Sequence, residues 1–468
     1  MRVADDEIDV IVVGAGFAGL AAARALSRVW LRVVVLEARD RVGGRAHTRV
    51  VDGGPWVDLG GQWIGPTQRE VLALANELEI ETFPTFTEGD NLVVAEGKKR
   101  RYRGLVPRVS PLALLDFGVA RWRLDRMAKE VPLDAPWKAP RAEEWDSTSL
   151  GDWLDANLKT KTARRLFEAA LETVYAAPAR ELSLLHALFY VRSGGDLDML
   201  LGTERGAQAT RVSGGMQGFA EKAAASLDVR LSCPVKRIEQ DEEGVTVSFD
   251  AGGARRSLRA SEVIVAIPPG LVADVAFAPA LPPERAELVA RMPMGAVIKH
   301  TAIYDRPFWR DDGLSGMVLS DEGPIHVVFD NSLPDAKSGI LMGFSEAKNA
   351  RRLGALTEDE RRAEAVACFA RYFGDRARRP IAYADHVWEH DPWSGGCYGA
   401  FMPPGVWTEL GPALREPHGR VHWAGTETAT AWSGYVDGAI SSGLRAANEI
   451  ARHRASHARP HSLSARRG

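Results

Sequence analysis

The stretch DVIVVGAGFAG, residues 9–19, decides the fold of this 468-residue chain. A short apolar run precedes the glycines, as in a buried parallel strand, and the helix-forming sequence LAAARALSRV follows them. Gly14 permits a tight turn, Gly16 lets the backbone approach a pyrophosphate, and Gly19 lets the helix pack closely on the strand. The amide groups that begin the helix would then face phosphates.

A second strand and an acid follow at the spacing of a dinucleotide-binding unit. Residues 31–36 (LRVVVL) are apolar apart from Arg32 and lead into Glu37, which lies 18 residues beyond Gly19. A carboxylate at about 20 residues accepts hydrogen bonds from ribose hydroxyls. The order strand, glycines, helix, strand and acid therefore indicates a nucleotide-binding α/β unit, although it does not choose between NAD and FAD.

Composition excludes several classes of protein. The chain is 45% hydrophobic and 26% charged, as in ordinary globular proteins, and its length allows two or three domains. A net charge of −3 provides no positive field for nucleic acid. The three cysteines Cys233, Cys368 and Cys397 form no CxxC motif, which is typical of a reducing compartment and predicts neither disulfides nor a metal site. The acidic N-terminus resembles no signal peptide, and no apolar stretch is long enough to span a membrane.

Four further motifs identify the nucleotide and the chemistry. EARDRVGGR (37–45) places three arginines and two glycines beside the expected phosphates, and GGQWIGPTQ (60–68) follows it. SGGCY (394–398) and AGTETATAWSGY (424–435) lie near the C-terminus. Together these motifs resemble those of the flavin-containing amine oxidases, in particular the monoamine oxidases, and the resemblance runs from about residue 9 to residue 450. It implies an FAD cofactor.

The resemblance also implies the domain organisation. We predict an α/β (mixed α+β) fold, in which a Rossmann-like FAD-binding domain is interleaved with a substrate-binding domain. Val245, Val247 and Phe249 alternate as in an antiparallel strand, and EVIVAI (262–267) predicts a further buried strand. Residues 83–212 are rich in helix formers and predict a mostly helical insert. The predicted FAD-binding domain comprises residues 7–82, 213–288 and 391–455, the substrate-binding domain residues 83–212 and 289–390, and a disordered tail residues 456–468.

The cofactor contacts implied by the resemblance are spread over the whole chain. Cys397 stands where related enzymes carry the flavin through an 8α-thioether. Arg45 follows two glycines and is expected to contact phosphate, whereas Arg39 and Arg41 could instead be surface ion-pair residues. The predicted FAD-binding residues are Gly14, Gly16, Ala18, Gly19, Glu37, Ala38, Arg39, Gly44, Arg45, Gly61, Gln62, Trp63, Val235, Trp388, Cys397, Gly425, Glu427, Gly434, Tyr435 and Val436.

Three residues are predicted to act in catalysis. Lys299 ends an apolar run that predicts a strand, and from the residues alone a solvated strand end is favoured. The resemblance implies instead that this lysine holds a water against flavin N5, with a pKa lowered by desolvation. Tyr398 and Tyr435 match the family's aromatic pair, which flanks the substrate amine. Two facing rings attract a cation or orient a nitrogen lone pair.

The predicted substrate pocket is mostly apolar. By position it comprises Thr173, Tyr175, Leu201, Gln208, Val327, Phe344, Tyr398 and Tyr435. No acid is carried onto this wall to pair with the distal ammonium of a diamine, and no arginine to clamp an amino-acid carboxylate. This favours FAD-dependent oxidative deamination of primary aryl-alkyl monoamines, in which O2 is consumed and aldehyde, ammonia and hydrogen peroxide form. The alternatives are a polyamine (putrescine) or L-amino-acid oxidase of the same fold, and a flavin-bearing binding protein without turnover.

The chain departs from the vertebrate pattern at three places. Gln62 and Trp63 replace a small polar residue and a tyrosine, Gly399 replaces a threonine, and no C-terminal membrane helix follows. The first two changes concern the fine substrate preference. The third predicts a soluble, cytoplasmic bacterial enzyme without a membrane anchor, whose partners are a small amine and O2. A homodimer is left open.

Overall fold

A five-stranded parallel sheet forms the centre of one half of the protein. The computed structural model describes residues 8–52, 54–104 and 106–457. The sheet has the order β10-β2-β1-β14-β21, with the strands β1 (Val10–Val13), β2 (Val33–Leu36), β10 (Asp228–Arg230), β14 (Glu262–Val265) and β21 (Val421–Trp423). Every residue of β1, β2 and β14 is buried, because helices cover one face of this sheet and a second sheet covers the other. The uninterrupted apolar runs in the sequence reflect this double burial.

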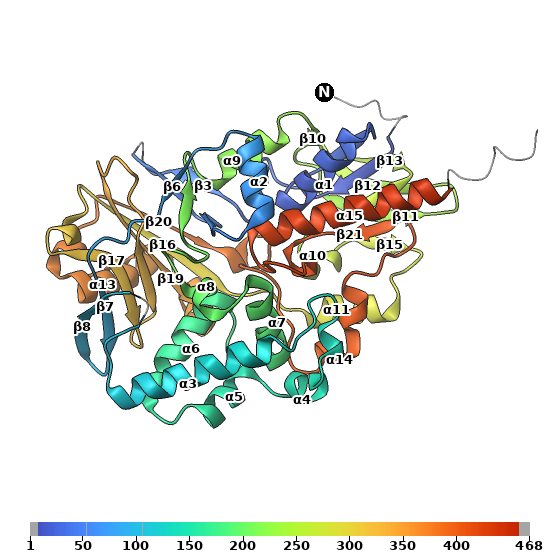
Figure 1. Ribbon diagram of the computed structural model, residues 1–468. Coiled ribbons are helices and arrows are strands. Elements are labelled where there is room, and N and C mark those ends of the chain that lie inside the picture. The colour runs from blue at the N-terminus through green and yellow to red at the C-terminus, as the bar shows by residue number, and fades with distance from the viewer. Residues whose placement is uncertain (1–7, 53, 105, 458–468) are drawn as a thin grey trace, which may run out of the picture.

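Helices from the two ends of the chain lie side by side on this sheet. In Figure 1, the blue helix α1 (Phe17–Arg28) runs beside the red helix α15 (Val436–His457). A Cβ at Gly443 would lie 2.1 Å from the Ala18 carbonyl oxygen, so only glycine permits this approach. Because α15 continues to His457, the tail predicted from residue 456 starts inside this helix, and residues 458–468 lie outside the described residues.

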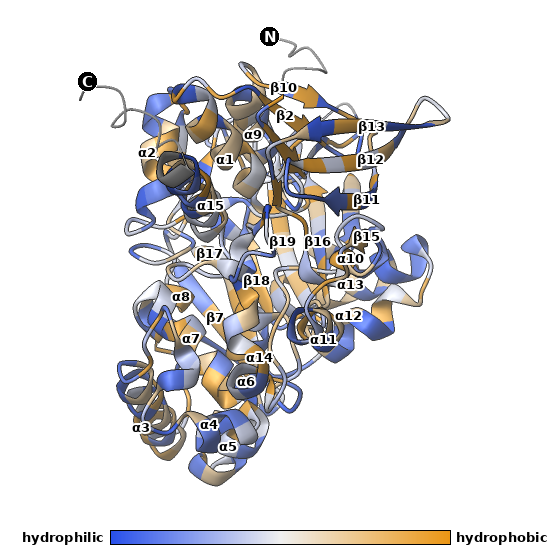
Figure 2. Cartoon of the chain, turned by 90° about the vertical axis from the view of Figure 1, so that its right-hand side faces the viewer, coloured by the Kyte–Doolittle hydropathy of each residue, from blue (hydrophilic) through white to orange (hydrophobic). Residues whose placement is uncertain are grey.

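A seven-stranded sheet forms the centre of the other half. Its order is β20-β16-β19-β18-β17-β7-β8, and all neighbours are antiparallel except β17 and β7. Its strands are β7 (Asp90–Ala95), β8 (Lys98–Tyr102), β16 (Val297–Tyr304), β17 (Leu314–Ser320), β18 (Val327–Asp330), β19 (Gly339–Glu346) and β20 (Ala382–Val387). Every residue of β16 and β19 is buried. In Figure 2, this sheet lies between the parallel sheet and a group of helices.

The helical insert predicted for residues 83–212 is only partly correct. Helices fill most of it: α3 (Pro111–Ala128), α4 (Ala142–Ser147), α5 (Leu150–Asn157), α6 (Lys161–Tyr175), α7 (Leu184–Gly194) and α8 (Leu197–Leu201). Its first part, however, contains most of strand β6 (Thr82–Pro84) and the β7–β8 hairpin, which joins the seven-stranded sheet, and its end is strand β9 (Thr210–Val212). In this hairpin β7 is largely buried and apolar, whereas β8 is a charged strand at the edge of the sheet. Basic residues on an edge strand keep it in solvent and discourage pairing with another chain.

The remaining elements complete an α/β fold, as predicted. A four-stranded sheet packs against the parallel sheet and contains β11 (Val235–Gln240), β12 (Val245–Ala251), β13 (Ala254–Ala260) and β15 (Ala276–Ala278). Two small sheets contain β3 (Thr48–Val50) and β4 (Trp56–Asp58), and β5 (Trp63–Ile64), β6 (Thr82–Pro84) and β9 (Thr210–Val212). The other α-helices are α2 (Arg69–Glu77), α9 (Met216–Ala224), α10 (Pro269–Val272), α11 (Pro283–Arg291), α12 (Ala347–Gly354), α13 (Glu358–Phe373) and α14 (Val406–Leu410). The division into two domains stays a prediction.

Within the described ranges, no helix combines the length and the apolar character needed to cross a bilayer. The same residues contain no group of three or more His, Cys, Asp or Glu side chains that could hold a metal ion.

Candidate active site

One cavity of about 1360 Å³ connects the two halves of the protein. Gly14 and Glu37 line it where β1 and β2 end, and Val327 and Phe344 line it on the seven-stranded sheet. Ligands of α/β folds bind at the carboxyl ends of parallel strands, which is where this cavity begins. It therefore reaches both the predicted nucleotide residues and the predicted substrate residues.

The glycine-rich turn leaves the N-terminus of α1 open toward the cavity. Gly14 has φ +102°, and a Cβ there would lie 2.8 Å from the Ala266 carbonyl oxygen. A Cβ at Gly19 would lie 1.9 Å from the Gly14 carbonyl oxygen, so the third glycine is required by helix–strand packing. Gly16 is the N-cap of α1, no side chain caps the helix, and a Cβ on Gly16 would meet nothing within 4 Å. The free amides and the open space suit a phosphate.

Glu37 is buried and holds the turn as well as facing the cavity. Its Oε2 accepts a hydrogen bond from the Ala15 amide at 2.7 Å, and its Oε1 accepts one from the Arg39 amide at 2.9 Å. The Arg39 side chain, 10% exposed, donates to Asp391 at 2.6 Å and to Ser394 at 2.7 Å. Arg39 is therefore an ion-pair residue, as the alternative expected, but it is not on the surface: it is largely enclosed, lines the cavity and pairs with a distant segment.

The other two arginines of this motif have structural partners. Arg41 donates to three backbone carbonyls, including that of Gly44, and so braces the Gly43–Gly44 turn. Arg45 forms a two-pronged ion pair with Glu427, at 2.6 and 3.2 Å, and donates to the Tyr398 carbonyl at 2.8 Å. Arg45 thus links the N-terminal motif to both C-terminal motifs, and its contact with phosphate stays a prediction.

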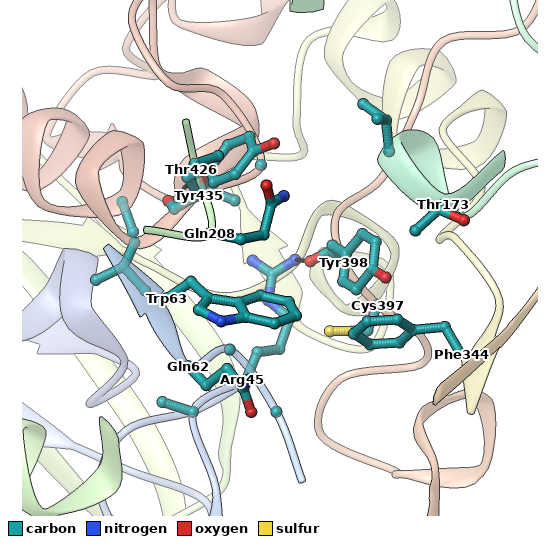
Figure 3. Close-up of a pocket in the computed structure, with 18 of the residues that line it drawn as sticks. Arg45, Gln62, Trp63, Thr173, Gln208, Phe344, Cys397, Tyr398, Thr426 and Tyr435 are labelled. Atoms are coloured by element: carbon teal, nitrogen blue, oxygen red, sulfur yellow. Dashed lines mark hydrogen bonds between the residues drawn. The ribbon is translucent and has the colours of Figure 1, made fainter. Parts of the chain in front are cut away.

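Cys397 and the two predicted tyrosines line the same part of the cavity. Figure 3 shows the Tyr398 and Tyr435 rings on two sides of one space, with Trp63 and Cys397 at its border. The Tyr435 ring packs on Trp432 at 4.9 Å, and the Tyr398 ring meets the Phe344 ring edge-on at 6.0 Å. Cys397 is a buried free thiol, and burial raises its pKa to about 12. These residues come from two loops, residues 397–398 and 432–435, and from the strands that contain Trp63 and Phe344.

Lys299 is not a strand end, contrary to the expectation from the residues alone. It is the third residue of β16, is 2% exposed, and donates from Nζ to the Gly60 carbonyl at 3.0 Å and to Gln62 Oε1 at 2.5 Å. Burial lowers its pKa to about 7, despite the opposing charge of Asp58. Its Nζ lies 5.8 Å from the centre of the Trp63 ring, behind the cavity wall. One of three ammonium donors remains available.

Most of the predicted residues line this cavity, and five of them do not. The cofactor residues on the wall are Gly14, Gly16, Ala18, Glu37, Ala38, Arg39, Gly44, Arg45, Gly61, Gln62, Trp63, Val235, Cys397, Gly425, Gly434, Tyr435 and Val436. The substrate residues on the wall are Thr173, Leu201, Gln208, Val327, Phe344 and Tyr398. Gly19, Tyr175, Lys299, Trp388 and Glu427 lie behind it.

Trp388 and Tyr175, which were predicted to touch cofactor and substrate directly, have their polar atoms engaged in the interior. Trp388 donates from Nε1 to the Leu59 carbonyl at 3.0 Å and packs beneath Gly60, where a Cβ would lie 3.0 Å from its ring. Tyr175 donates to the Ala187 carbonyl at 3.1 Å. Both side chains support the wall from behind, so the predictions that they touch cofactor or substrate directly have no support in this geometry.

Sequence reasoning missed an acid near the substrate wall. Glu346 ends β19 and is 1% exposed, and neither carboxyl oxygen makes a well-formed hydrogen bond. Burial raises its pKa to about 8, against a smaller opposing effect of the Thr173 hydroxyl. It shares a sheet face with Phe344 and Lys299, because alternate residues and directly opposed residues face the same side. The period-two spacing from Phe344 was the signal that could have revealed it.

Comparison with known proteins agrees with this geometry. Residues 17–451 match the family described as flavin containing amine oxidoreductase. The Mycobacterium tuberculosis protein AofH, named as a flavin-containing monoamine oxidase, is 48% identical over 446 residues, covering 95% of this chain and 96% of the relative. Amine oxidase [flavin-containing] B of Canis lupus familiaris is 40% identical over 449 residues, covering 94% of this chain and 86% of the relative.

Two solved structures share the whole fold. Cyclohexylamine oxidase from Brevibacterium oxydans superposes with a TM-score of 0.90 at 35% identity, covering 96% of this chain and 100% of that one. Putrescine oxidase superposes with a TM-score of 0.91 at 34% identity, covering 95% and 99%. The chain therefore belongs to the flavin-containing amine oxidase family and is an amine-oxidising oxidoreductase with a flavin cofactor.

Proposed function

We propose that this enzyme oxidatively deaminates primary aryl-alkyl monoamines with FAD and O2, which yields an aldehyde, ammonia and hydrogen peroxide. The observation that carries the proposal is the single cavity. It begins at the uncapped N-terminus of α1, passes between Tyr398 and Tyr435, and continues to Phe117 on α3. Next to the tyrosines the wall includes Leu201, Val327 and Phe344, which suit an aryl-alkyl side chain.

The residues present fit FAD. The open space at Gly16 and the free amides of α1 would hold the pyrophosphate, and Glu37 would face a ribose. Gly61 and Trp63, farther along the same wall, would border the flavin ring. When bound, the flavin accepts a hydride equivalent from the carbon next to the amine and passes the electrons to O2.

The protein's own contribution is positioning, desolvation and proton control. The Tyr398 and Tyr435 rings would hold the amine between them, and the surrounding apolar wall favours its neutral form. Burial raises the pKa of both phenols, so the rings stay uncharged over the working range. Lys299, with a pKa of about 7, can take up or release a proton near neutral pH.

We also propose that Cys397 holds the flavin through an 8α-thioether. Its place in the SGGCY motif and on the cavity wall supports this link. Acid-precipitated wild-type protein should then stay yellow, and Cys397→Ala should release its flavin into the supernatant. Free flavin from the denatured wild type would refute the link and leave the amine oxidase assignment intact.

A second candidate substrate class, diamines, is favoured by one observation. Glu346 is a buried acid beside Thr173, whose side chain is on the wall, and an acid there could attract a second ammonium group. The fold similarity to putrescine oxidase agrees with this alternative. Glu346 does not line the cavity itself, but Asp198 and Glu204, on either side of Leu201, do, which corrects the expectation that no acid is present on this wall.

A panel of amines with a peroxide readout tests the proposal. Benzylamine, phenethylamine and tyramine should be turned over with a higher kcat/KM than putrescine or L-phenylalanine. Faster turnover of putrescine would select the diamine oxidase, and faster turnover of L-phenylalanine the amino-acid oxidase. Absence of flavin bleaching with every amine would indicate a binding protein without turnover.

We propose a cytoplasmic location on the evidence of the cysteines. Cys233, Cys368 and Cys397 are all free and buried, as expected in a reducing compartment. Fractionation of the native cells would test this location. Sedimentation would decide whether the enzyme is a homodimer.

A further inference from the structure

Helix α3 exposes an apolar stripe that no other described residue covers. Leu112, Leu115, Val119 and Trp122 follow each other at intervals of three, four and three residues, and their exposed fractions are 72%, 66%, 38% and 57%. This spacing places them on one face of the helix. We call these four residues the α3 stripe. A contiguous exposed apolar patch of this kind usually marks an interaction surface.

The stripe is not the result of a loosely packed helix. The opposite face of α3 is firmly buried: Ala113, Ala120, Leu124 and Ala128 belong to the core and are at most 2% exposed. The N-cap Ser110 accepts a hydrogen bond from the Ala113 amide at 3.2 Å, which fixes the start of the helix. In Figures 1 and 2, α3 lies at the outer edge of the molecule, so its second apolar face points to solvent.

The region around the stripe is strongly basic. Residues 98–129 contain ten Lys and Arg but only two Asp, whereas the whole chain has a net charge of −3. Arg101 and Arg103 pair with Asp90, and Arg121 pairs with Asp198, so part of this charge is neutralised. The exposed cations that remain next to the stripe are Arg108, Arg123, Arg126 and Lys129.

Both acids of α3 turn toward the protein. Asp116 accepts hydrogen bonds from the amides of Lys159 and Thr160, at 2.8 and 2.7 Å. Asp125 accepts one from the Leu197 amide at 3.0 Å. The exposed face of the helix therefore combines apolar and cationic side chains, and the first exposed acid is Glu130, just beyond its end. The Arg126 guanidinium lies 5.4 Å from the centre of the Trp122 ring.

We propose that α3 docks the enzyme on an anionic lipid surface. The α3 stripe enters the boundary between headgroups and acyl chains, and the cations beside it contact the anionic headgroups. A second copy of this chain is a poorer partner, because two such faces would oppose cation to cation. Nucleic acid is also poorer, because it would leave the four apolar side chains in water.

The position of α3 connects docking to the cavity. Phe117, on the same helix, and Pro107, just before it, both line the cavity. A docked enzyme would thus hold this part of the cavity wall close to the bilayer interface. If the proposed function is correct, amines with apolar side chains that partition into the interface would be concentrated there. That consequence rests on the proposed function, whereas docking itself is measured without any amine.

Flotation of the holoenzyme with lipid vesicles tests the proposal. Vesicles of phosphatidylcholine and phosphatidylglycerol should bind it at low salt, and pure phosphatidylcholine vesicles at least about tenfold more weakly. The variant Leu112→Ser/Leu115→Ser/Trp122→Ser should lose at least about tenfold in binding, as should Arg123→Gln/Arg126→Gln/Lys129→Gln. The matched control is Trp30→Ser/Ile381→Ser, which removes exposed apolar side chains of 92% and 64% exposure elsewhere.

The outcomes separate the alternatives. The control should bind vesicles like the wild type, and all variants should keep the wild-type circular dichroism and peroxide production from benzylamine. No vesicle binding at low salt, or equal binding by the α3 variants, would overturn docking. A wild-type dimer that the apolar variant converts to a monomer would show instead that the stripe joins two copies. Retention on heparin without vesicle binding would identify a polyanion site.

Discussion

The two ends of the cavity position their groups in different ways. At the predicted nucleotide end the backbone does so, because Gly14 and Gly19 admit no Cβ and a Cβ on Gly16 would point into open space. At the predicted amine end, side chains form the wall. Thr173 comes from α6 and Phe344 from β19, so their positions depend on how these two elements pack. We therefore expect substitutions at the first end to abolish folding or cofactor binding. Substitutions at the second end should change activity by degrees and alter the choice of substrate.

The largest expected effect is at the nucleotide end. Gly19→Ala places a Cβ 1.9 Å from the Gly14 carbonyl oxygen, so α1 must move away from β1. We expect a loss of about 3 kcal/mol or more in the free energy of unfolding, together with loss of bound flavin. Urea denaturation and the flavin absorbance per protein would measure both.

Gly16→Ala is the matched control for that experiment. Its Cβ would meet no atom within 4 Å, so the fold should be kept. Flavin content should nevertheless fall, because the methyl group would occupy the space proposed for the pyrophosphate. If Gly16→Ala unfolded as readily as Gly19→Ala, the separation of packing from cofactor binding would be wrong.

Breaking the ion pair between Arg45 and Glu427 should destabilise the fold by a comparable amount. Arg45→Met leaves Glu427, whose side chain is 2% exposed, without its charged partner. Breaking a buried pair in this way costs about 3–5 kcal/mol, whereas replacing both members costs less. Urea denaturation of Arg45→Met and of Arg45→Met/Glu427→Leu should show this order. A double variant less stable than the single one would contradict it.

Lys299→Met should reduce activity more than stability. We expect kcat/KM for benzylamine to fall by about a hundredfold and a limb near pH 7 to vanish from the pH profile. Burial lowers the pKa of this lysine from 10.5 to about 7. Between pH 7 and pH 10.5 the lysine is therefore protonated in the unfolded chain and mostly neutral in the folded one. Its contribution to stability therefore rises with pH across this window and is lost as pH falls through 7.

Gln62→Leu is the companion variant. It removes one of two acceptors from the Lys299 ammonium, which favours the neutral amine. The limb near pH 7 should move to lower pH with little change in the maximal rate. A limb that stayed in place in both variants would assign it to a group other than Lys299.

Glu346→Gln should have the smallest effect on the wild-type reaction. Burial raises the pKa of Glu346 from 4.5 to about 8, so the folded chain keeps a proton that the unfolded chain loses. Stability from this group is full below pH 4.5 and declines by at most about 1.4 kcal/mol per pH unit as pH rises to 8. Relative to the wild type, the variant should gain stability over this window. Denaturation at pH 5 and pH 8 would measure the difference.

The same variant also tests the choice of substrate. If the enzyme prefers aryl-alkyl monoamines, Glu346→Gln should change kcat/KM for phenethylamine less than about threefold, as expected for a residue behind the wall. A drop of about tenfold or more for putrescine alone would support the diamine alternative. Equal losses for both amines would indicate a purely structural role.

Local sequence could reveal those residues whose positions are fixed by the conformation of the nearby backbone. The turn at Gly14, the packing of Gly19 and the position of Glu37 follow from a short, ordered motif, because a turn and a helix start depend on nearby residues. The C-terminal motifs likewise pointed to Cys397 and Tyr435, which the structure places on the cavity wall. Resemblance, rather than periodicity, supplied the link between these distant segments.

The errors arose where a side chain's partner lies far away in the chain. From the residues alone a solvated strand end was favoured for Lys299, and only the resemblance indicated a role at the flavin, because nothing near it in sequence shows the carbonyl of Gly60 or the amide of Gln62. Trp388 read as a wall residue because its partner, the Leu59 carbonyl, becomes its neighbour only in the folded chain. Glu346 was overlooked because an acid at the end of a strand is ordinarily solvated.

The sequence by itself determined the nucleotide-binding turn, the alternation of strands and helices, and the amine oxidase family. Only the tertiary structure decided which side chains reach the cavity and which stand behind it. It also decided that Arg45 pairs with Glu427 and that the second apolar face of α3 is exposed. The physical reason is that backbone conformation depends on neighbours in sequence, whereas burial and pairing depend on contacts between residues hundreds of positions apart.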